Sequence, residues 1–280
     1  MARILITGAT GNVGEVVARL IDEDGAPAVR ASRSGSGAGE VRFDFTDPAT
    51  WDEAFDGVES MFLVRPPAIG NVKRDLLPAM EAAKAAGVRN VVFLSLQGAE
   101  HNKVVPHAAV EEWLLGSGLT WTFVRASFFD QNLTTTHLTD VRDRDEIVVP
   151  AGTGATAFVD AEDVGAVAAA ALLDPARFGN KALTVTGPRA YTYDQIAQML
   201  STELGRPIRY TKPGALAYMR HARKVLGMQW GMVVVTTAIY TTARLGKAAG
   251  LTDTVRVVLG REPIDFPEFA HREREAWLHH

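Results

Sequence analysis

Residues 4–20 read ILITGATGNVGEVVARL, and this stretch decides the fold. An apolar run typical of a β-strand leads into Gly8, Gly11 and Gly14, and then into a helical pattern of valines that ends at Leu20. Glycine at position 8 permits a turn, at 11 lets the backbone approach a pyrophosphate, and at 14 lets helix and strand pack closely. The start of the helix would offer free N–H groups to phosphates. We therefore expect a dinucleotide-binding turn rather than a purely structural one.

Short apolar runs alternate with helical patterns along the first two thirds of the chain, which indicates βαβ units. The expected strands are Arg3–Thr7, Ala28–Ser32, Val41–Phe45, Ser60–Val64, Asn90–Ser95 and Thr120–Arg125. Helices are expected at residues 12–23, 48–55, 70–86 and 107–117. The pattern predicts an α/β fold with a Rossmann-type, doubly wound parallel sheet.

The pattern loosens after residue 150, where Pro and Gly interrupt further helical stretches. We expect residues 1–150 to form an NAD(P)-binding Rossmann domain, with a strand near residues 182–186 returning to it. Residues 187–280 are expected to form a small, mainly helical domain at a substrate cleft. The final Leu278 to His280 are either native or the remnant of a tag, and no function is given to them.

Composition excludes several classes of function. The 280 residues carry a formal charge of −4 and no cysteine, which removes disulfides, thiolate metal sites and cysteine nucleophiles. No excess of basic residues is available for nucleic acid. Residues 225–243 are uncharged, but glycine, threonine and glutamine dilute them, so we expect no membrane span. Arg3 leads directly into an apolar strand, so we expect no signal peptide and a cytoplasmic protein.

The tip of the expected second strand indicates which dinucleotide binds. It reads RASRS and lacks the carboxylate that accepts the ribose 2′-hydroxyl of NAD(H). Arg33 can form a charge-assisted fork to a 2′-phosphate, and Ser32 or Ser34 can add neutral donors. NADP(H) is therefore expected in preference to NAD(H), unless Arg33 is only a solvated surface residue. At the next strand end, Asp44 and Phe45 would contact the adenine, although Asp44 would equally suit the start of a turn.

Several blocks together resemble one known family. In order, they are TGATGNVG, ASRS, FDFTDPATW, FLVRPP, VVFLSLQGAE, HAAVEEWLLGSGLTWTFVRASFFDQNL and AFVDAEDVGAVAAAAL. The chain is similar to the NmrA-like branch of the atypical short-chain dehydrogenase/reductases. That resemblance implies a Rossmann domain binding NADP(H) or NAD(H) and a small C-terminal domain over a cleft. Members range from quinone and other small-molecule reductases to redox-sensing regulators.

The resemblance also implies roles for individual residues. Arg33 matches the 2′-phosphate site, and Asp44 with Phe45 matches the adenine pocket. Ser95 stands where related dehydrogenases place a catalytic serine, and His107 stands where many members carry a lysine. The phosphate loop matches Gly8, Thr10, Gly11, Asn12, Val13 and Gly14, and the segment passing near the ribose matches Leu63, Val64, Arg65 and Pro66.

One expected element is missing. Related dehydrogenases use a Tyr-xxx-Lys pair to move the proton of the substrate oxygen, and none of the five tyrosines here has a lysine four residues later. All five lie after residue 190. We expect His107 to titrate near neutrality, and it could hydrogen-bond the nicotinamide ribose or donate a proton to a reduced substrate. Its alternative role is that of a helix-start residue in solvent.

Phe128, Phe129 and Asn132 follow the sixth expected strand, at the sheet edge where ligands bind. We expect them to contact the substrate, although one phenylalanine would equally suit the core. No HExxH or comparable cluster predicts a metal.

Two functions remain open. The first is an NADP(H)-dependent oxidoreductase that transfers hydride to a small flat acceptor such as a quinone. The second is a non-catalytic regulator that senses NADP(H) against NADP⁺ and signals to a protein partner. A homodimer is compatible with either. The missing Tyr-xxx-Lys pair favours sensing, and the aromatic, uncharged C-terminal region favours a substrate pocket.

Overall fold

A computed structural model describes residues 3–103 and 105–278, so His279 and His280 of the terminal segment lie outside the described residues. The chain divides into two compact units. Unit 1 comprises Met1–Ala126, Ala161–Val185 and Thr254–Arg261, and unit 2 comprises Ser127–Asp160, Thr186–Asp253 and Glu262–His280. Residues 127–150, which the sequence analysis grouped with the first domain, therefore belong to unit 2 by contacts, and the chain passes between the units repeatedly.

Unit 1 contains a seven-stranded, wholly parallel sheet in the order β10-β6-β5-β4-β1-β2-β3. Its strands are β1 (Arg3–Ile6), β2 (Ala28–Ser32), β3 (Glu40–Arg42), β4 (Val58–Val64), β5 (Asn90–Leu96), β6 (Thr120–Ala126) and β10 (Lys181–Val185). The order reverses between β1 and β4, which is the switch point where open α/β sheets bind ligands. The predicted Rossmann-type fold is confirmed.

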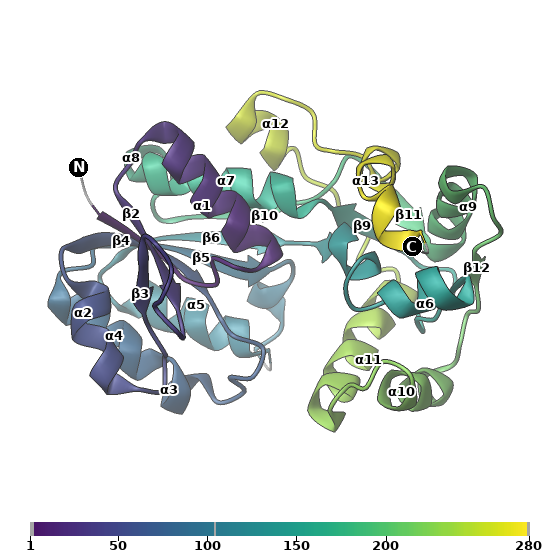
Figure 1. Cartoon of the computed structure of the whole chain (residues 1–280), viewed down its shortest axis with the longest axis horizontal. Coiled ribbons are helices and arrows are strands. Elements are labelled where there is room, and N and C mark those ends of the chain that lie inside the picture. The colour runs from purple at the N-terminus through teal and green to yellow at the C-terminus, as the bar shows by residue number, and fades with distance from the viewer. Residues whose placement is uncertain (1–2, 104, 279–280) are drawn as a thin grey trace. The chain divides into compact units, whose positions relative to one another are not determined.

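Helices cover both faces of this sheet (Figure 1). On one face lie α1 (Asn12–Asp24), α7 (Ala161–Leu173), α8 (Pro175–Phe178) and α12 (Thr254–Leu259). On the other lie α2 (Trp51–Phe55), α3 (Val72–Asp75), α4 (Leu77–Ala86) and α5 (Pro106–Gly116). The 3₁₀ turns of this unit are η1 (Pro48–Thr50) and η2 (Ala99–His101). Helices α1 and α7 pack closely because position 165 is glycine: a Cβ there would lie 2.5 Å from Val16 Cγ1.

Two expected elements of unit 1 differ in detail. The expected helix over residues 70–86 is interrupted at Leu76, and Pro78 starts α4 because its ring tolerates only the first turn. The third strand was expected to run to Phe45 but ends at Arg42. There the carboxylate of Asp44 accepts the backbone N–H of Thr46 at 2.8 Å and turns the chain away.

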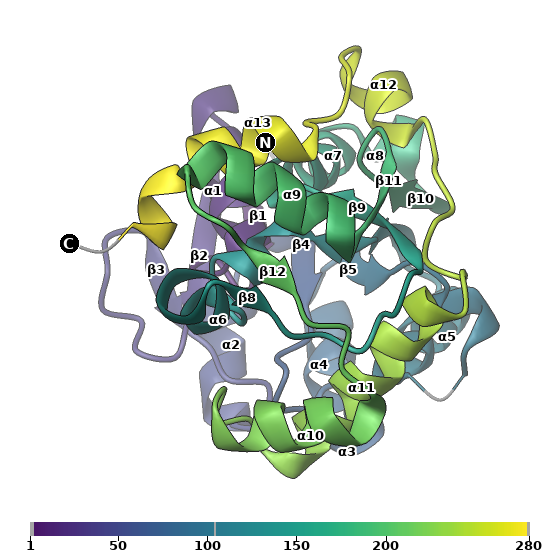
Figure 2. The same ribbon diagram turned by 90° about the vertical axis from the view of Figure 1, so that its right-hand side faces the viewer.

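Unit 2 combines two small sheets with helices (Figure 2). Strand β9 (Ala155–Val159) pairs in parallel with β7 (Phe128–Phe129) and antiparallel with β11 (Ala190–Thr192), and β8 (Glu146–Ile147) pairs with β12 (Arg209–Tyr210). The helices are α6 (Leu138–Arg144), α9 (Tyr193–Leu204), α10 (Ala215–Lys224), α11 (Trp230–Arg244) and α13 (Phe266–Arg272), with 3₁₀ turns η3 (Asp130–Leu133) and η4 (Arg274–Trp277). An aromatic core that includes Tyr193, Tyr218, Phe269 and Trp277 joins them.

Only part of the uncharged stretch 225–243 lies in helix α11. Gly227 has a φ of +65°, and α11 begins after it, at Trp230. Within the described part of the chain, every helix is too short or too polar to cross a bilayer.

Candidate functional site

The glycine turn joins β1 to α1 at the switch point of the sheet. Gly8 has a φ of +63°, and a Cβ at this position would lie 3.1 Å from Val64 Cβ at the end of β4. A Cβ at Gly14 would lie 2.0 Å from the carbonyl oxygen of Gly8, so only glycine fits there. Thr7 Oγ1 accepts the Val64 N–H at 2.8 Å and fixes the two strand ends side by side.

The outer surface of this turn is open. Gly8, Thr10, Gly11 and Asn12 are exposed, whereas Val13 faces the core. Helix α1 has Gly11 as its N-cap, and no side chain caps its first N–H groups. A 13-residue helix whose first turn is uncapped and exposed presents several N–H donors and the positive end of its dipole. This cradle fits a pyrophosphate.

Arg65 follows β4 beside the turn. Its Nη1 donates to the carbonyl oxygens of Pro66 at 2.9 Å and Ile69 at 2.8 Å, which curls the loop around the guanidinium. Its Nε is enclosed, and no described residue accepts from it. Burial lowers the pKa of Arg65 from its ordinary value. The neighbouring predicted residues differ in exposure, since Leu63 is fully buried and Val64 is half-buried.

His107, the second residue of α5, lies close enough to Arg65 to feel its charge. Burial, and then the Arg65 cation, lower the pKa of His107 to about 4. Its ring lies 5.9 Å from that of Phe93, and its Nδ1 is enclosed without a hydrogen-bond partner among the described residues. The expectation that His107 titrates near neutrality is therefore corrected: at pH 7 the imidazole is neutral, so an imidazolium is not its source of a proton.

Ser95 is engaged by another side chain. It is buried on β5, and its Oγ donates to Glu111 Oε1 at 2.6 Å. Arg125 on β6 donates to both oxygens of the same carboxylate, at 3.0 and 2.7 Å, and this pairing raises the pKa of Arg125. Ser95 and Arg125 are directly opposite in the β5–β6 register. Sequence reasoning missed Glu111, although it lies in the quoted EEWLLGSG block.

The tip of β2 contains a carboxylate that the sequence analysis did not place there. Glu40 starts β3, and its Oε2 accepts the hydroxyl of Ser32 at 2.7 Å and the N–H of Gly37 at 3.1 Å. Arg33 and Ser34 are exposed. The parallel pairing of Arg30 with Glu40 brings the acidic residue to this edge, but the pairing could not be seen in the sequence.

The residues expected around the adenine have structural contacts of their own. Asp44 Oδ1 accepts both the N–H and the hydroxyl of Thr46, and these bonds lower the pKa of Asp44. This is the turn role that the sequence analysis gave as the alternative. Phe45 is buried, with its ring 4.7 Å from that of Phe43 and edge-on to it.

The residues expected to contact a substrate belong to unit 2. Phe128 and Phe129 form β7 and are both half-buried, and the ring of Phe128 lies 6.2 Å from that of Tyr240. Asn132 is half-buried in η3; its carbonyl oxygen accepts the N–H of His137 at 2.8 Å, and its side-chain amide has no partner within the described ranges. The preceding residue, Gln131, donates to Asp160 at 2.8 Å.

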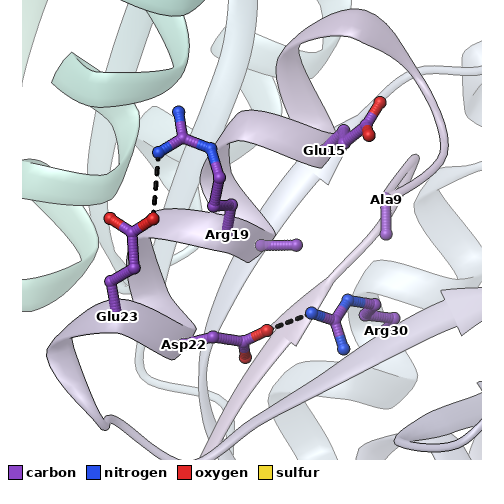
Figure 3. A pocket seen from close by; sticks show the side chains of 7 residues that line it. Ala9, Glu15, Arg19, Asp22, Glu23 and Arg30 are labelled. Atoms are coloured by element: carbon purple, nitrogen blue, oxygen red, sulfur yellow. Dashed lines mark hydrogen bonds and ion pairs between the residues drawn. The ribbon is translucent and has the colours of Figure 1, made fainter.

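A hollow beside α1 contains none of the predicted site residues. Figure 3 shows its lining, in which Arg19 pairs with Glu23 at 3.1 Å and Arg30 pairs with Asp22. These two ion pairs occupy the arginines of the hollow, and Glu15 also lines it. Across residues 3–103 and 105–278, no cluster of three or more acidic or histidine side chains could hold a metal.

Comparisons with known proteins agree with this geometry. The family model described as the NmrA-like family matches residues 1–222. The NAD(P)H azoreductase of Xenophilus azovorans is 33% identical over 98% of this chain and 99% of its own. The (4-alkanoyl-5-oxo-2,5-dihydrofuran-3-yl)methyl phosphate reductase of Streptomyces griseus is 32% identical over the same shares. The structure of an NADPH-dependent quinone oxidoreductase from Escherichia coli, complexed with NADPH, aligns with a TM-score of 0.85 at 23% identity over 96% of this chain and 99% of that one.

The sheet order and the glycine turn define a Rossmann-type α/β protein. Within that class, the chain belongs to the NmrA-like family.

Proposed function

We propose that this protein is an oxidoreductase that binds a nicotinamide dinucleotide, with NADP(H) preferred, and reduces a small flat acceptor such as a quinone. The observation that carries the proposal is the exposed, uncapped turn at Gly8–Gly14, beside which Arg65 and His107 each have an enclosed nitrogen without a partner in the described part of the chain. Buried polar atoms normally have a partner, so two such atoms beside a phosphate cradle support a ligand there. The reductases among the relatives support the reaction class.

Each group of the cofactor has a proposed contact. The pyrophosphate would contact the N–H groups of Asn12, Val13 and Gly14, because that of Gly11 donates to the carbonyl oxygen of Gly8 at 2.9 Å, and a 2′-phosphate would contact the guanidinium of Arg33. The enclosed nitrogens of Arg65 and His107 face the ribose of the nicotinamide half. In this role the neutral His107 exchanges a hydrogen bond with a ribose hydroxyl, which needs no charge on the imidazole.

When bound, the cofactor supplies a hydride to the acceptor. The acceptor gains two electrons and one hydrogen, and the second proton comes from water. A quinone permits this because its electron affinity favours hydride transfer before protonation, so no strong acid is required from the protein. Such an acceptor is compatible with three observations: the sequence has no Tyr-xxx-Lys pair, His107 is neutral at pH 7, and the Ser95 hydroxyl is hydrogen-bonded to Glu111.

Phe128 and Asn132 are the proposed contacts of the acceptor. A half-buried aromatic ring provides a flat apolar surface, and the unpartnered amide of Asn132 can donate to a carbonyl oxygen of the acceptor. Replacing Phe128 by alanine should then raise KM more than it lowers kcat.

Stopped-flow oxidation of NADPH with a panel of quinones and azo dyes tests the proposal. We expect oxidation well above the protein-free rate for at least one acceptor. Rates equal to that control across the panel would overturn the reductase. If NADPH and NADP⁺ then bound with different affinities in calorimetry, the redox-sensing alternative would take its place, since sensing requires differential affinity without turnover.

A further inference from the structure

The connection between β2 and β3 is built around one carboxylate. Only residues 33–39 join these two parallel strands, and three of them are glycines. At the far end, Glu40 Oε2 accepts the hydroxyl of Ser32 at 2.7 Å and the N–H of Gly37 at 3.1 Å. The acid thereby ties the first and last parts of the connection together.

The glycines of this segment are needed for the close fit. Gly35 has a φ of +61°, and a Cβ there would lie 2.5 Å from the backbone nitrogen of Arg42. A Cβ at Gly37 would lie 2.6 Å from Glu40 Cδ. At Gly35 the close neighbour is backbone, so only glycine fits there, whereas at Gly37 the close neighbour is the Glu40 side chain itself. The register of β2 with β3 places Glu40 near the strand tip, and its bonds to Ser32 and Gly37 orient the carboxylate.

The charges at the tip are few and mostly paired. Arg30 forms an ion pair with Asp22, and Arg42 forms one with Asp47 at 3.1 Å. Arg33 has no ion pair within the described residues, and Glu40 accepts hydrogen bonds from Ser32 and Gly37 and also feels the Ser36 N–H and the charge of Arg30. These bonds, from Ser32 first, lower the pKa of Glu40, so its carboxylate is ionised at neutral pH.

Ser32 is consequently not the free donor that the sequence suggested. Its hydroxyl hydrogen points to Glu40, and its oxygen accepts the N–H of Gly35 at 2.8 Å. The charges near a 2′-phosphate at this tip would include the Arg33 cation and the Glu40 anion; Arg33 also acts on Asp44, and Arg30 acts on Glu40. A ribose 2′-hydroxyl would meet an acceptor, because both bonds to the protein use Oε2 and Oε1 takes part in neither.

We propose that Glu40 is a specificity-determining residue that opposes Arg33: its carboxylate disfavours the 2′-phosphate of NADP(H) and accepts the 2′-hydroxyl of NAD(H). This inference rests on the proposed function, since it requires that a nicotinamide dinucleotide binds at the glycine turn. The protein then prefers NADP(H) only modestly and retains NAD(H) as a usable cofactor. The acid lies on the third strand, outside the second-strand tip where the position is normally sought.

The test is calorimetric measurement of Kd for NADPH and NADH with the wild-type chain, Glu40→Gln and Arg33→Asp. Glutamine keeps an acceptor oxygen for Ser32 and removes only the charge. We expect Glu40→Gln to shift the affinity ratio towards NADPH by about three- to tenfold, the size of one unit charge acting across a solvated site. Arg33→Asp should shift the ratio towards NADH. Added salt should reduce the effect of Glu40→Gln, because an exposed charge is screened.

Asp47→Asn is the matched control, because it removes a nearby exposed carboxylate that is already paired with Arg42. Its ratio should change by less than about twofold. An unchanged ratio in Glu40→Gln, with both cofactors still bound, would overturn the role of Glu40 and leave it as a loop contact. Failure of the wild-type chain to bind either cofactor would instead overturn the proposed function. Thermal unfolding of each variant shows whether it is folded.

Discussion

Two histidines, half-buried His107 in unit 1 and buried His137 in unit 2, have different surroundings. In unit 1, His107 lies near the Arg65 cation, and its enclosed Nδ1 has no partner in the described part of the chain. In unit 2, His137 is 1% exposed, and its Nε2 lies 2.7 Å from the hydroxyl of Tyr240, while its Nδ1 lies 3.6 Å from Asp140. Neither Nδ1 makes a hydrogen bond within the described residues, but His137 faces a hydroxyl and a carboxylate, whereas the charge that acts on His107 is the Arg65 cation.

The contrast extends to the groups around each histidine. Asp140 is wholly buried, and besides His137 it is bonded by His221 Nε2, at 2.8 and 2.9 Å, and approached by Arg144 at 3.8 Å. A buried carboxylate with these partners is compensated within the fold. Arg65, near His107, donates hydrogen bonds from Nη1 to backbone carbonyl oxygens, and its Nε has no hydrogen-bond partner among the described residues. Because His137 Nδ1 also makes no hydrogen bond within the described residues, an unpartnered nitrogen does not by itself indicate a ligand. The additional observation in unit 1 is the exposed, uncapped glycine turn.

Removing the centre of the unit 2 network should have the largest effect. Asp140→Ala removes the carboxylate that His137, His221 and Arg144 approach. It should lower the free energy of unfolding by about 3–5 kcal/mol. Urea denaturation followed by tryptophan fluorescence measures this, because buried Trp277 reports on unit 2. Asp143→Ala on the same helix is the control: its exposed pair with Arg142 should be worth less than about 1 kcal/mol. Equal costs for the two variants would contradict the structural role of the network.

Local patterns predicted the parts of the fold that depend on neighbours in sequence. The alternation of apolar runs located β1, β2, β4, β5 and β6 to within two residues, because each buried strand has its own composition. The glycine turn was equally predictable, since its three glycines, the preceding strand and the following helix are contiguous.

Pairings between distant residues could not be predicted in this way. The bond between His137 and Tyr240 joins positions 103 residues apart, and only the fold of unit 2 brings them together. The bond from Ser95 to Glu111 depends on how α5 lies over β5, and that of Ser32 with Glu40 depends on the register of β2 with β3. Periodicity determines which face a residue is on, but not which side chain it meets there. The bond from Ser95 to Glu111 and the low pKa of His107 could not be predicted for this reason, and the predicted roles of both residues in a site stay predictions.

The pH dependence of the free energy of unfolding tests the surroundings of His107. The pKa of His107 is about 4 in the folded chain, below its ordinary value of 6.5. Between those values the unfolded chain binds the extra proton, so the free energy of unfolding must fall as pH drops from about 6.5 towards 4. His107→Gln should show a shallower fall over this window. Urea midpoints at intervals from pH 8 to 4.5 measure the slope, with exposed His101 replaced by glutamine as the control. If both variants kept the wild-type slope, the surroundings described for His107 would be incorrect.

Ser95→Ala should have the smallest effect on the free energy of unfolding. In unit 1, the side chains of Ser95, Glu111 and Arg125 hydrogen-bond one another. The Ser95 hydroxyl donates to Glu111, which Arg125 already holds with two bonds, so Ser95→Ala should cost only about 0.5–1.5 kcal/mol of unfolding free energy. Buried Ser60 on β4, replaced by alanine, provides a matched comparison. With NADPH and the best quinone, kcat should remain within about twofold of wild type, whereas removal of a proton-transferring serine costs about a hundredfold or more. A loss of kcat of that size, with stability retained, would mean that the Ser95 hydroxyl leaves Glu111 during turnover. A side chain that is hydrogen-bonded within the fold could then still take part in the reaction.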